Sequence, residues 1–262
     1  MQLRLFQKMK RAGVEPNAAC FSGLIRRDRR KAYGNEPESN VGSDSSKLDI
    51  KHYNRLLKEG NDDMDATIVL FEKMKNELNV APDALSYGAV LHGLAKIGDY
   101  QRAQSYFHKM QEASIAPSVH SFSQIMAAYS YHGFVDECIE HFETMCSLNL
   151  EANEKHYNSI LSAAAKSGKT TIAQKYFDKM IHAQLAPDAH LFNTLISGCQ
   201  RDPSSAEFWF DKLREQKLAP SIVTYNSLLK IYASVGDADA AEALLASMGF
   251  TAVLPDRISW MT

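Results

Sequence analysis

Residues 84–188 decide the fold, and they read ALSYGAVLHGLAKIGDYQRAQSYFHKMQEASIAPS, VHSFSQIMAAYSYHGFVDECIEHFETMCSLNLEAN and EKHYNSILSAAAKSGKTTIAQKYFDKMIHAQLAPD. Each of these three consecutive segments is 35 residues long, and four positions hold one kind of residue in all three. These positions hold Tyr87, Phe122 and Tyr157; Gly98, Gly133 and Gly168; Phe107, Phe142 and Phe177; and Met110, Met145 and Met180. Self-similarity at a fixed period is the signature of a protein built from stacked repeats.

Each segment also has the hydrophobic period of two helices joined by a turn. Ala103, Tyr106, Phe107 and Met110 stand at i, i+3, i+4 and i+7, which is the apolar face of an amphipathic helix. A glycine marks the turn in the middle, and in the first and third segments a proline near the end stops the second helix. No stretch of alternating strand pattern competes with this interpretation. The sequence therefore predicts an all-α solenoid of helix–turn–helix hairpins.

The same frame extends along most of the chain. We expect repeats at 50–83, 84–118, 119–153, 154–188, 189–221 and 222–256, with 257–262 opening a further, truncated repeat. Residues 1–25 read as partial or divergent repeats, because Phe6, Met9 and Pro16 keep the mutual spacing found in the later ones. Residues 26–49 are rich in charged residues, Gly, Asn and Ser, which predicts a flexible insertion. Its basic run is either a solvated loop or an arm that contacts phosphate.

Composition argues against several classes of protein. The formal net charge of −2 does not suit a strongly cationic, non-specific nucleic-acid binder, although it is compatible with a locally basic face. No apolar run reaches the length of a membrane span. The four cysteines form no C-x-x-C pair, and we interpret them as reduced thiols. Because the histidines and cysteines form no cluster with ligand spacing, we expect no metal and no cofactor.

Motifs for catalysis are also missing. The run from Ser167 to Thr171 resembles the end of a phosphate-binding loop, but Ala163 stands where that loop requires glycine. Gly168 is instead the recurring turn glycine. The sequence contains no H-E-x-x-H motif and no G-x-S-x-G motif. We therefore expect neither an enzyme nor a small-molecule substrate.

Taken together, these features resemble the pentatricopeptide repeat, in the form of a P-type array of 35-residue repeats. The resemblance rests on the period, the Tyr-Asn-Ser-Ile-Leu opening at 157–161, the Phe-x-x-Met of the second helix and the Pro-Asp close at 187–188. The Trp, Leu-Gly and Tyr spacing of the 34-residue tetratricopeptide repeat is absent. The resemblance implies a right-handed superhelix that binds single-stranded RNA, one base per repeat.

In this family, the fifth and the last residue of a repeat read the base. The corresponding pairs here are Asn54 with Asp83, Gly88 with Ser118, Ser123 with Asn153, Asn158 with Asp188, Asn193 with Ser221, and Asn226 with Asp256. The family's base code then implies a preference near 5′-U-N-A-U-C-U-3′. Gly88 has no side chain, so its repeat has no clear preference.

The resemblance also implies contacts to the faces of the bases and to the RNA backbone. The second residue of a repeat sandwiches the base, and a cation near the end of the first helix contacts phosphate. These residues are Leu85, His120, His190 and Val223 for the base, and Lys96, Lys166 and Arg201 for the backbone. Lys51 and Lys155 depart from the family's second position, which puts base sandwiching in doubt for their repeats.

Two interpretations of the paired residues stay open. The last residues of the repeats can serve as helix caps rather than as base readers. Asn158, Asn193 and Asn226, in contrast, lie within the first turn of a helix, where Asn has poor propensity. Because the sequence shows no local need for Asn there, we expect these three side chains to serve RNA.

The resemblance places such a protein in a mitochondrion or chloroplast, where it would act in RNA processing, stabilisation or translation. Its partner would be single-stranded RNA, without a membrane. One alternative is a helical-repeat scaffold that binds protein. Another is the RNA-gripping part of an enzyme similar to protein-only RNase P, whose catalytic domain is not in this chain.

Overall fold

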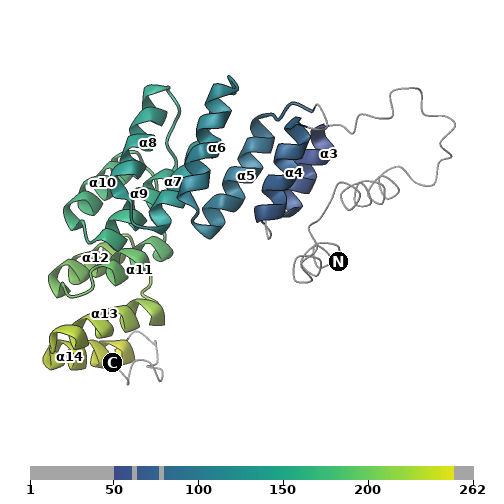
Figure 1. Ribbon diagram of the computed structural model, residues 1–262. Helices are drawn as coiled ribbons and strands as arrows, with labels where there is room; N and C mark the ends of the chain where they lie inside the picture. The colour runs from purple at the N-terminus through teal and green to yellow at the C-terminus, as the bar shows by residue number, and fades with distance from the viewer. Residues whose placement is uncertain (1–49, 61–63, 77–79, 251–262) are drawn as a thin grey trace, which may run out of the picture. The chain divides into compact units, whose positions relative to one another are not determined.

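The computed structural model describes residues 50–60, 64–76 and 80–250, and within these residues the chain is all-helical. Its twelve helices are α3 (Ile50–Glu59), α4 (Met64–Asn76), α5 (Ala84–Ile97), α6 (Tyr100–Glu112), α7 (Val119–Tyr131), α8 (Val135–Ser147), α9 (Glu154–Ser167), α10 (Thr170–His182), α11 (Ala189–Gly198), α12 (Pro203–Glu215), α13 (Ile222–Val235) and α14 (Ala238–Phe250). Consecutive helices pair as hairpins (Figure 1). The predicted all-helical array of hairpins is confirmed. The predictions for 1–25, 26–49 and 257–262 lie outside the described residues.

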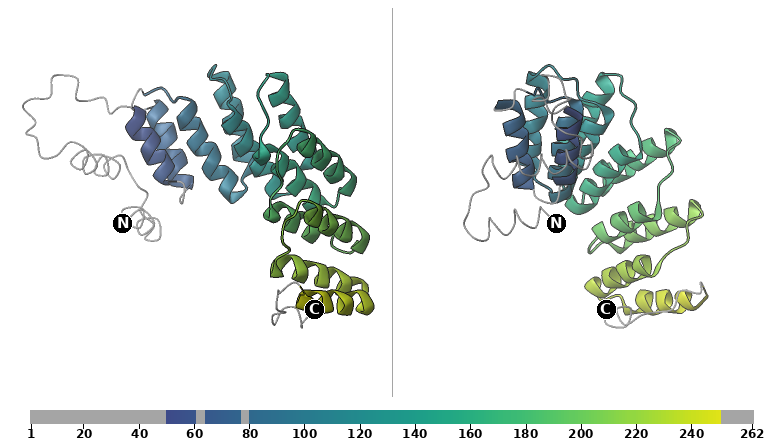
Figure 2. Two further views of the ribbon diagram at one scale, coloured as in Figure 1. Left: turned by 180° about the vertical axis from the view of Figure 1, so that it is seen from behind. Right: turned by 90° about the vertical axis from the view of Figure 1, so that its right-hand side faces the viewer.

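The described residues form two compact units, with the boundary between Val90 and Leu91 inside α5. In the first unit, α3 packs on α4, and the buried side chains include Tyr53, Leu57 and Phe71. In the second unit, the first helices of successive hairpins pack on one another, so that α9 contacts both α7 and α11, and α11 contacts α13. Two further views show the same succession of hairpins from α7 to α14 (Figure 2).

One aromatic contact recurs between neighbouring hairpins. The phenylalanine of a second helix meets, edge to face, the aromatic residue at the fourth position of the next hairpin. The ring centroids are 4.9 Å apart for Phe71–Tyr87, 5.2 Å for Phe107–Phe122, 5.1 Å for Phe142–Tyr157, 5.5 Å for Phe177–Phe192 and 5.7 Å for Phe210–Tyr225. Such pairs contribute about 0.5–1.5 kcal/mol beyond the area that they bury. The two aromatic positions of the repeat are therefore joined across each hairpin interface.

The recurring glycines make the turns between the two helices of a hairpin. Gly98, Gly133, Gly168 and Gly236 all have positive φ, between 68° and 78°. This left-handed conformation lets the chain leave the first helix, and it costs any other residue free energy because its Cβ approaches the backbone. Gly168, the residue of the apparent phosphate-binding loop, is the C-cap of α9. It acts as a turn residue, as the sequence indicates.

Two of these glycines differ in what surrounds them, which gives a matched test of the turn. A Cβ added at Gly98 would lie 2.4 Å from Cδ1 of Tyr131, whereas a Cβ at Gly168 would meet nothing within 4 Å. We expect Gly168→Ala to lower the free energy of unfolding by about 1–2 kcal/mol, the cost of a left-handed alanine. Gly98→Ala should cost more, because the Tyr131 ring must also move.

Urea unfolding of the two variants, with and without Tyr131→Ala, measures this difference. In the Tyr131→Ala background the cost of Gly98→Ala should fall to that of Gly168→Ala. Equal costs in the unmodified background would contradict the role assigned to the Tyr131 contact.

Candidate functional site

Each hairpin exposes the second residue of its first helix. Leu85 is 71% exposed and Val223 is 56% exposed, although both are large apolar side chains. His120 and His190 are exposed at the same position, as are Lys51 and Lys155. These two side chains leave apolar surface exposed at the start of the helix. Such a surface suits the face of a planar ligand.

The last residue of each repeat caps the first helix of the next one. Asp83 Oδ1 accepts from the backbone N–H groups of Leu85 (3.0 Å) and Ser86 (2.9 Å), and Asp188 Oδ1 accepts from Leu191 N–H (2.7 Å). Ser118, Asn153 and Ser221 are N-caps in the same way. The capping interpretation is therefore confirmed for these five residues. It does not exclude a second role, because a carboxylate or hydroxyl accepts more than one hydrogen bond. Asp256 lies outside the described residues.

In the first unit, the fifth residue contacts the last residue of its own repeat directly. Asn54 Nδ2 donates to both carboxylate oxygens of Asp83, at 3.1 and 3.3 Å. The third residue of the next hairpin completes the group, because Ser86 Oγ donates to Asn54 Oδ1 at 2.6 Å. The pair that the resemblance assigns to one base is thus a single hydrogen-bonded unit.

In the second unit, two further pairs are linked by the residue at the third position of the next hairpin. Thr224 Oγ1 donates to Asn193 Oδ1 at 2.6 Å and lies 3.1 Å from Ser221 Oγ. Asn193 therefore has a structural partner 31 residues away in the next hairpin, which no local pattern in the sequence reveals. Its expected role toward RNA stays a prediction.

His156 links the other pair. Its Nε2 is 3.0 Å from Ser123 Oγ, and its Nδ1 accepts from the backbone N–H of Asn153 at 3.1 Å.

Asn158 is the exception among the asparagines of the second unit. Its side-chain Oδ1 is buried and has no hydrogen-bond partner, the only such side-chain atom among the described residues. The third residue of the next hairpin is Leu191, whose buried side chain has no donor. Gly88 has no side chain to hold, and Asn226 lies half-buried in α13.

The candidate phosphate cations differ in their surroundings. Lys166 Nζ donates to the carbonyl oxygens of Ser130 and Tyr131, both at 3.1 Å, and lies 5.2 Å from the centre of the Tyr131 ring. It therefore caps the C-terminal end of α7, and burial lowers its pKa. Lys96 and Arg201 are exposed near the ends of α5 and α11.

The tautomer of His156 follows from its contacts. Because Nδ1 accepts from Asn153 N–H, the ring proton sits on Nε2, which donates to the carbonyl of Val119 at 3.1 Å. The side chain is fully buried, and this desolvation lowers its pKa. His156 is therefore a neutral, structural histidine.

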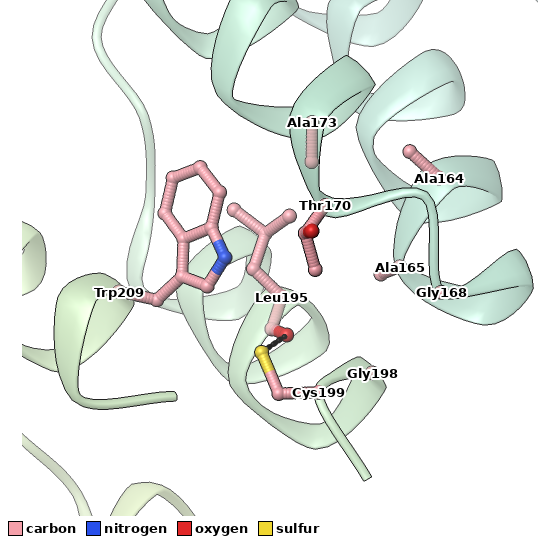
Figure 3. A pocket seen from close by; sticks show the side chains of 9 residues that line it. All are labelled: Ala164, Ala165, Gly168, Thr170, Ala173, Leu195, Gly198, Cys199 and Trp209. Atoms are coloured by element: carbon pink, nitrogen blue, oxygen red, sulfur yellow. Dashed lines mark hydrogen bonds between the residues drawn. The ribbon is translucent and has the colours of Figure 1, made fainter. Parts of the chain in front are cut away.

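A small recess between α9, α10, α11 and α12 offers no reactive group. Its volume of about 10 Å³ holds about one water molecule, and its lining includes Leu195, Cys199 and Trp209 (Figure 3). The Cys199 thiol donates to the carbonyl of Leu195 at 3.2 Å, and burial raises its pKa to about 12. A protonated thiol is a poor nucleophile, so the recess is a packing seam.

Within the described part of the chain, no three or more His, Cys, Asp or Glu are grouped so that they could hold a metal ion. No helix there is long and apolar enough to cross a membrane.

Comparison with known families finds pentatricopeptide repeats along most of the chain. A family model described as the pentacotripeptide-repeat region of PRORP matches residues 38–195. A model of the pentatricopeptide repeat domain matches residues 185–235 and 208–260. No curated protein sequence gives a significant match.

Solved structures of such repeats are similar to this chain. PPR10 in complex with an 18-nucleotide psaJ RNA element has a TM-score of 0.73 and 22% identity, over 99% of this chain and 38% of that one. PPR10 from maize has a TM-score of 0.70 and 25% identity over the same shares. The PPR domain of Arabidopsis thaliana protein-only RNase P 1 in complex with tRNA has a TM-score of 0.59 and 12% identity, over 70% and 97%. The chain thus spans less than half the length of PPR10.

The buried His156 and the half-buried His141 should make the stability of the fold depend on pH. Burial lowers the folded-state pKa of His156 and His141 below the ordinary 6.5, so the unfolded chain binds protons more readily. The stability that their neutral forms contribute is present above about pH 6.5 and is lost as the pH falls through their folded pKa values. We expect the free energy of unfolding of the wild type to be lower at about pH 5.5 than at about pH 7.5.

His156→Gln tests this assignment, because glutamine does not titrate but offers an oxygen to Asn153 N–H and an amide donor to the Val119 carbonyl. Its decrease in unfolding free energy between the two pH values should be smaller than that of the wild type. An unchanged decrease, measured by urea unfolding, would rule out His156 as a contributor.

Proposed function

This chain belongs to the pentatricopeptide repeat family, and we propose that it binds single-stranded RNA, with each hairpin reading one base. The proposal is carried by the side chains that lie together where the first helix of a hairpin begins. There the fifth and last residues lie together through hydrogen bonds, as with Asn54 and Asp83, beside an exposed second residue such as Leu85. A base needs an apolar surface for its face and polar atoms for its edge, and this grouping offers both.

We infer the base preference from the paired residues. Asn with Asp favours U at the repeats of Asn54 and Asn158, and at that of Asn226. Ser123 with Asn153 favours A, and Asn193 with Ser221 favours C. The resulting preference is near 5′-U-N-A-U-C-U-3′. Exposed second residues would stack on the bases, with His120 and His190 serving as aromatic surfaces and Leu85 and Val223 as aliphatic ones.

Among the described residues, few cations stand at the family's phosphate position, so we expect binding to be modest and to weaken with salt. Lys96 and Arg201 are exposed and would contact phosphate. Lys166 would do so only by leaving the carbonyl oxygens of Ser130 and Tyr131. Its principal role is therefore to hold α7.

The biological role that we propose is the processing, stabilisation or translation of transcripts in a mitochondrion or chloroplast. By covering an RNA segment, the array would keep nucleases or a pairing strand away from it, without a catalytic step of its own.

A second candidate is favoured by the family-model match to the repeat region of PRORP. In that case the chain would be the RNA-gripping part of an enzyme similar to protein-only RNase P. Preference for a folded tRNA precursor over single-stranded RNA would favour this alternative.

Substituting both proposed base-reading residues of the repeat 119–153 tests whether they select the third base. We expect Ser123→Asn with Asn153→Asp to move the preferred third base from A to U, because the pair then matches that of Asn158 and Asp188. The change should be about tenfold in relative affinity, as is typical of one base-edge contact. Fluorescence anisotropy with four RNAs that differ only at the third base measures it.

Two controls accompany this measurement. Ser147→Asn, at the exposed end of α8 in the same repeat, should leave the preference unchanged. Single-stranded DNA of the same sequence controls for non-specific binding. Failure of the wild type to bind U-N-A-U-C-U RNA at low salt would overturn the proposed function, and binding of an extended peptide instead would favour a protein scaffold.

A further inference from the structure

We propose that the third residue of a hairpin is a positioning residue for the base-reading side chain of the hairpin before it. Ser86, His156 and Thr224 hold this position, and each contacts the fifth residue of the preceding hairpin. None of the three belongs to the fifth, last or second positions to which base recognition is assigned above. The proposal rests on the proposed function, because it concerns how selectively each hairpin reads its base.

The hydroxyl of Thr224 has a defined direction. Its oxygen accepts from Ser221 N–H at 3.0 Å, and its hydrogen is donated to Asn193 Oδ1 at 2.6 Å. A hydroxyl has only one hydrogen, so this contact fixes which end of the Asn193 amide is occupied. The oxygen is held, and the Nδ2 amino group is the end that remains to meet a base.

A third-position hydroxyl also meets an asparagine oxygen in the first unit. Ser86 Oγ accepts from Asp83 N–H at 3.2 Å and lies 2.6 Å from Asn54 Oδ1 and 3.0 Å from Asp83 Oδ1. Unlike Asn193, Asn54 also donates its Nδ2 to the Asp83 carboxylate. The same third-position hydroxyl therefore appears in two hairpins of separate units, each time between the capping residue and an asparagine oxygen.

His156 takes this place with a ring, whose Nδ1 meets Asn153 N–H and whose Nε2 lies 3.0 Å from Ser123 Oγ. Its contact is one of packing rather than donation, because the Nε2 proton and the Ser123 hydroxyl both go to the carbonyl of Val119.

The repeat 154–188 supplies the natural comparison. The third residue of the hairpin that follows it is Leu191, which cannot donate, and the Asn158 oxygen is buried without a partner. The Asn158 oxygen is therefore not held by the following hairpin, whereas the Asn193 oxygen is. We infer that this repeat discriminates less sharply between bases than the repeat of Asn193 does.

Removing and adding the hydroxyl tests the proposal in both directions. Thr224→Val keeps the shape of the side chain but removes the donor, and it should reduce base discrimination by the Asn193 repeat about fivefold. Leu191→Thr adds a donor beside Asn158 and should increase discrimination by that repeat by a similar factor. The readout is the ratio of Kd values within two sets of four RNAs. One set differs only at the fourth base, and the other differs only at the fifth.

Ser121→Ala is the matched control. Ser121 forms the same reciprocal cap, with its Oγ 3.4 Å from Ser118 N, but the fifth residue of the preceding repeat is Gly88. This variant loses the capping contact to Ser118, which belongs to the second base, without loosening a reader of the fourth or the fifth base. It should leave discrimination at the fourth and fifth bases unchanged, so it separates an effect on helix capping from one on base reading. Thr224→Ser restores the hydroxyl and should restore discrimination relative to Thr224→Val.

The outcomes separate this inference from the proposed function. If the wild type binds RNA with a preference at the fifth base and Thr224→Val keeps that preference, the inference is wrong and the proposed function stands. If Thr224→Val weakens binding to all four RNAs equally, Thr224 is structural and the inference is also wrong. If the wild type binds no RNA, or binds it without any preference, base reading and the inference both fall. Thr224→Val decides the question even if Leu191→Thr does not fold.

Discussion

The edge-to-face contact between hairpins is the interaction on which the described structure depends. In each case the phenylalanine of a second helix meets the aromatic residue at the fourth position of the following hairpin, as Phe142 meets Tyr157 at 5.1 Å. A single hairpin cannot bury both rings, so neighbouring hairpins bury them for each other. The contact also fixes the rotation of the first helix about its axis. The second residue of that helix then faces away from the interface, as the exposure of Leu85 and Val223 shows.

This rotation explains how one short segment carries two kinds of side chain. The fourth residue is buried in the aromatic contact, while the second residue, such as Leu85 or Val223, stays exposed. The third residue faces the cap of its own helix and the first helix of the preceding hairpin, as Thr224 does between Ser221 and Asn193. Helix capping and the candidate base-reading site are therefore not alternatives. They share atoms, because the capping residue ends one repeat and begins the next.

The described fold could be predicted closely from the sequence, because the period of four residue types repeats the same local chemistry in every segment. The glycine turns and the caps also follow from local chemistry, since each depends on residues within a few positions of one another. The candidate site was predictable only as a set of positions. The role of Lys166 as a cap on α7 was not, because its partners are carbonyl groups 35 and 36 residues away. No local pattern in the sequence records which backbone groups an adjacent hairpin brings to a lysine.

By itself, the sequence determined the repeat, the order of its helices and the residues at each position. Only the tertiary structure decided which side chains meet across neighbouring hairpins. Asn54, Asn158 and Asn193 occupy equivalent positions, yet Asn54 and Asn193 have a hydroxyl donor and the Asn158 oxygen has none. The physical reason is that the partner of each asparagine lies about one repeat away in sequence and one helix away in space. Whether that partner is serine, threonine or leucine affects the asparagine only after the hairpins have packed.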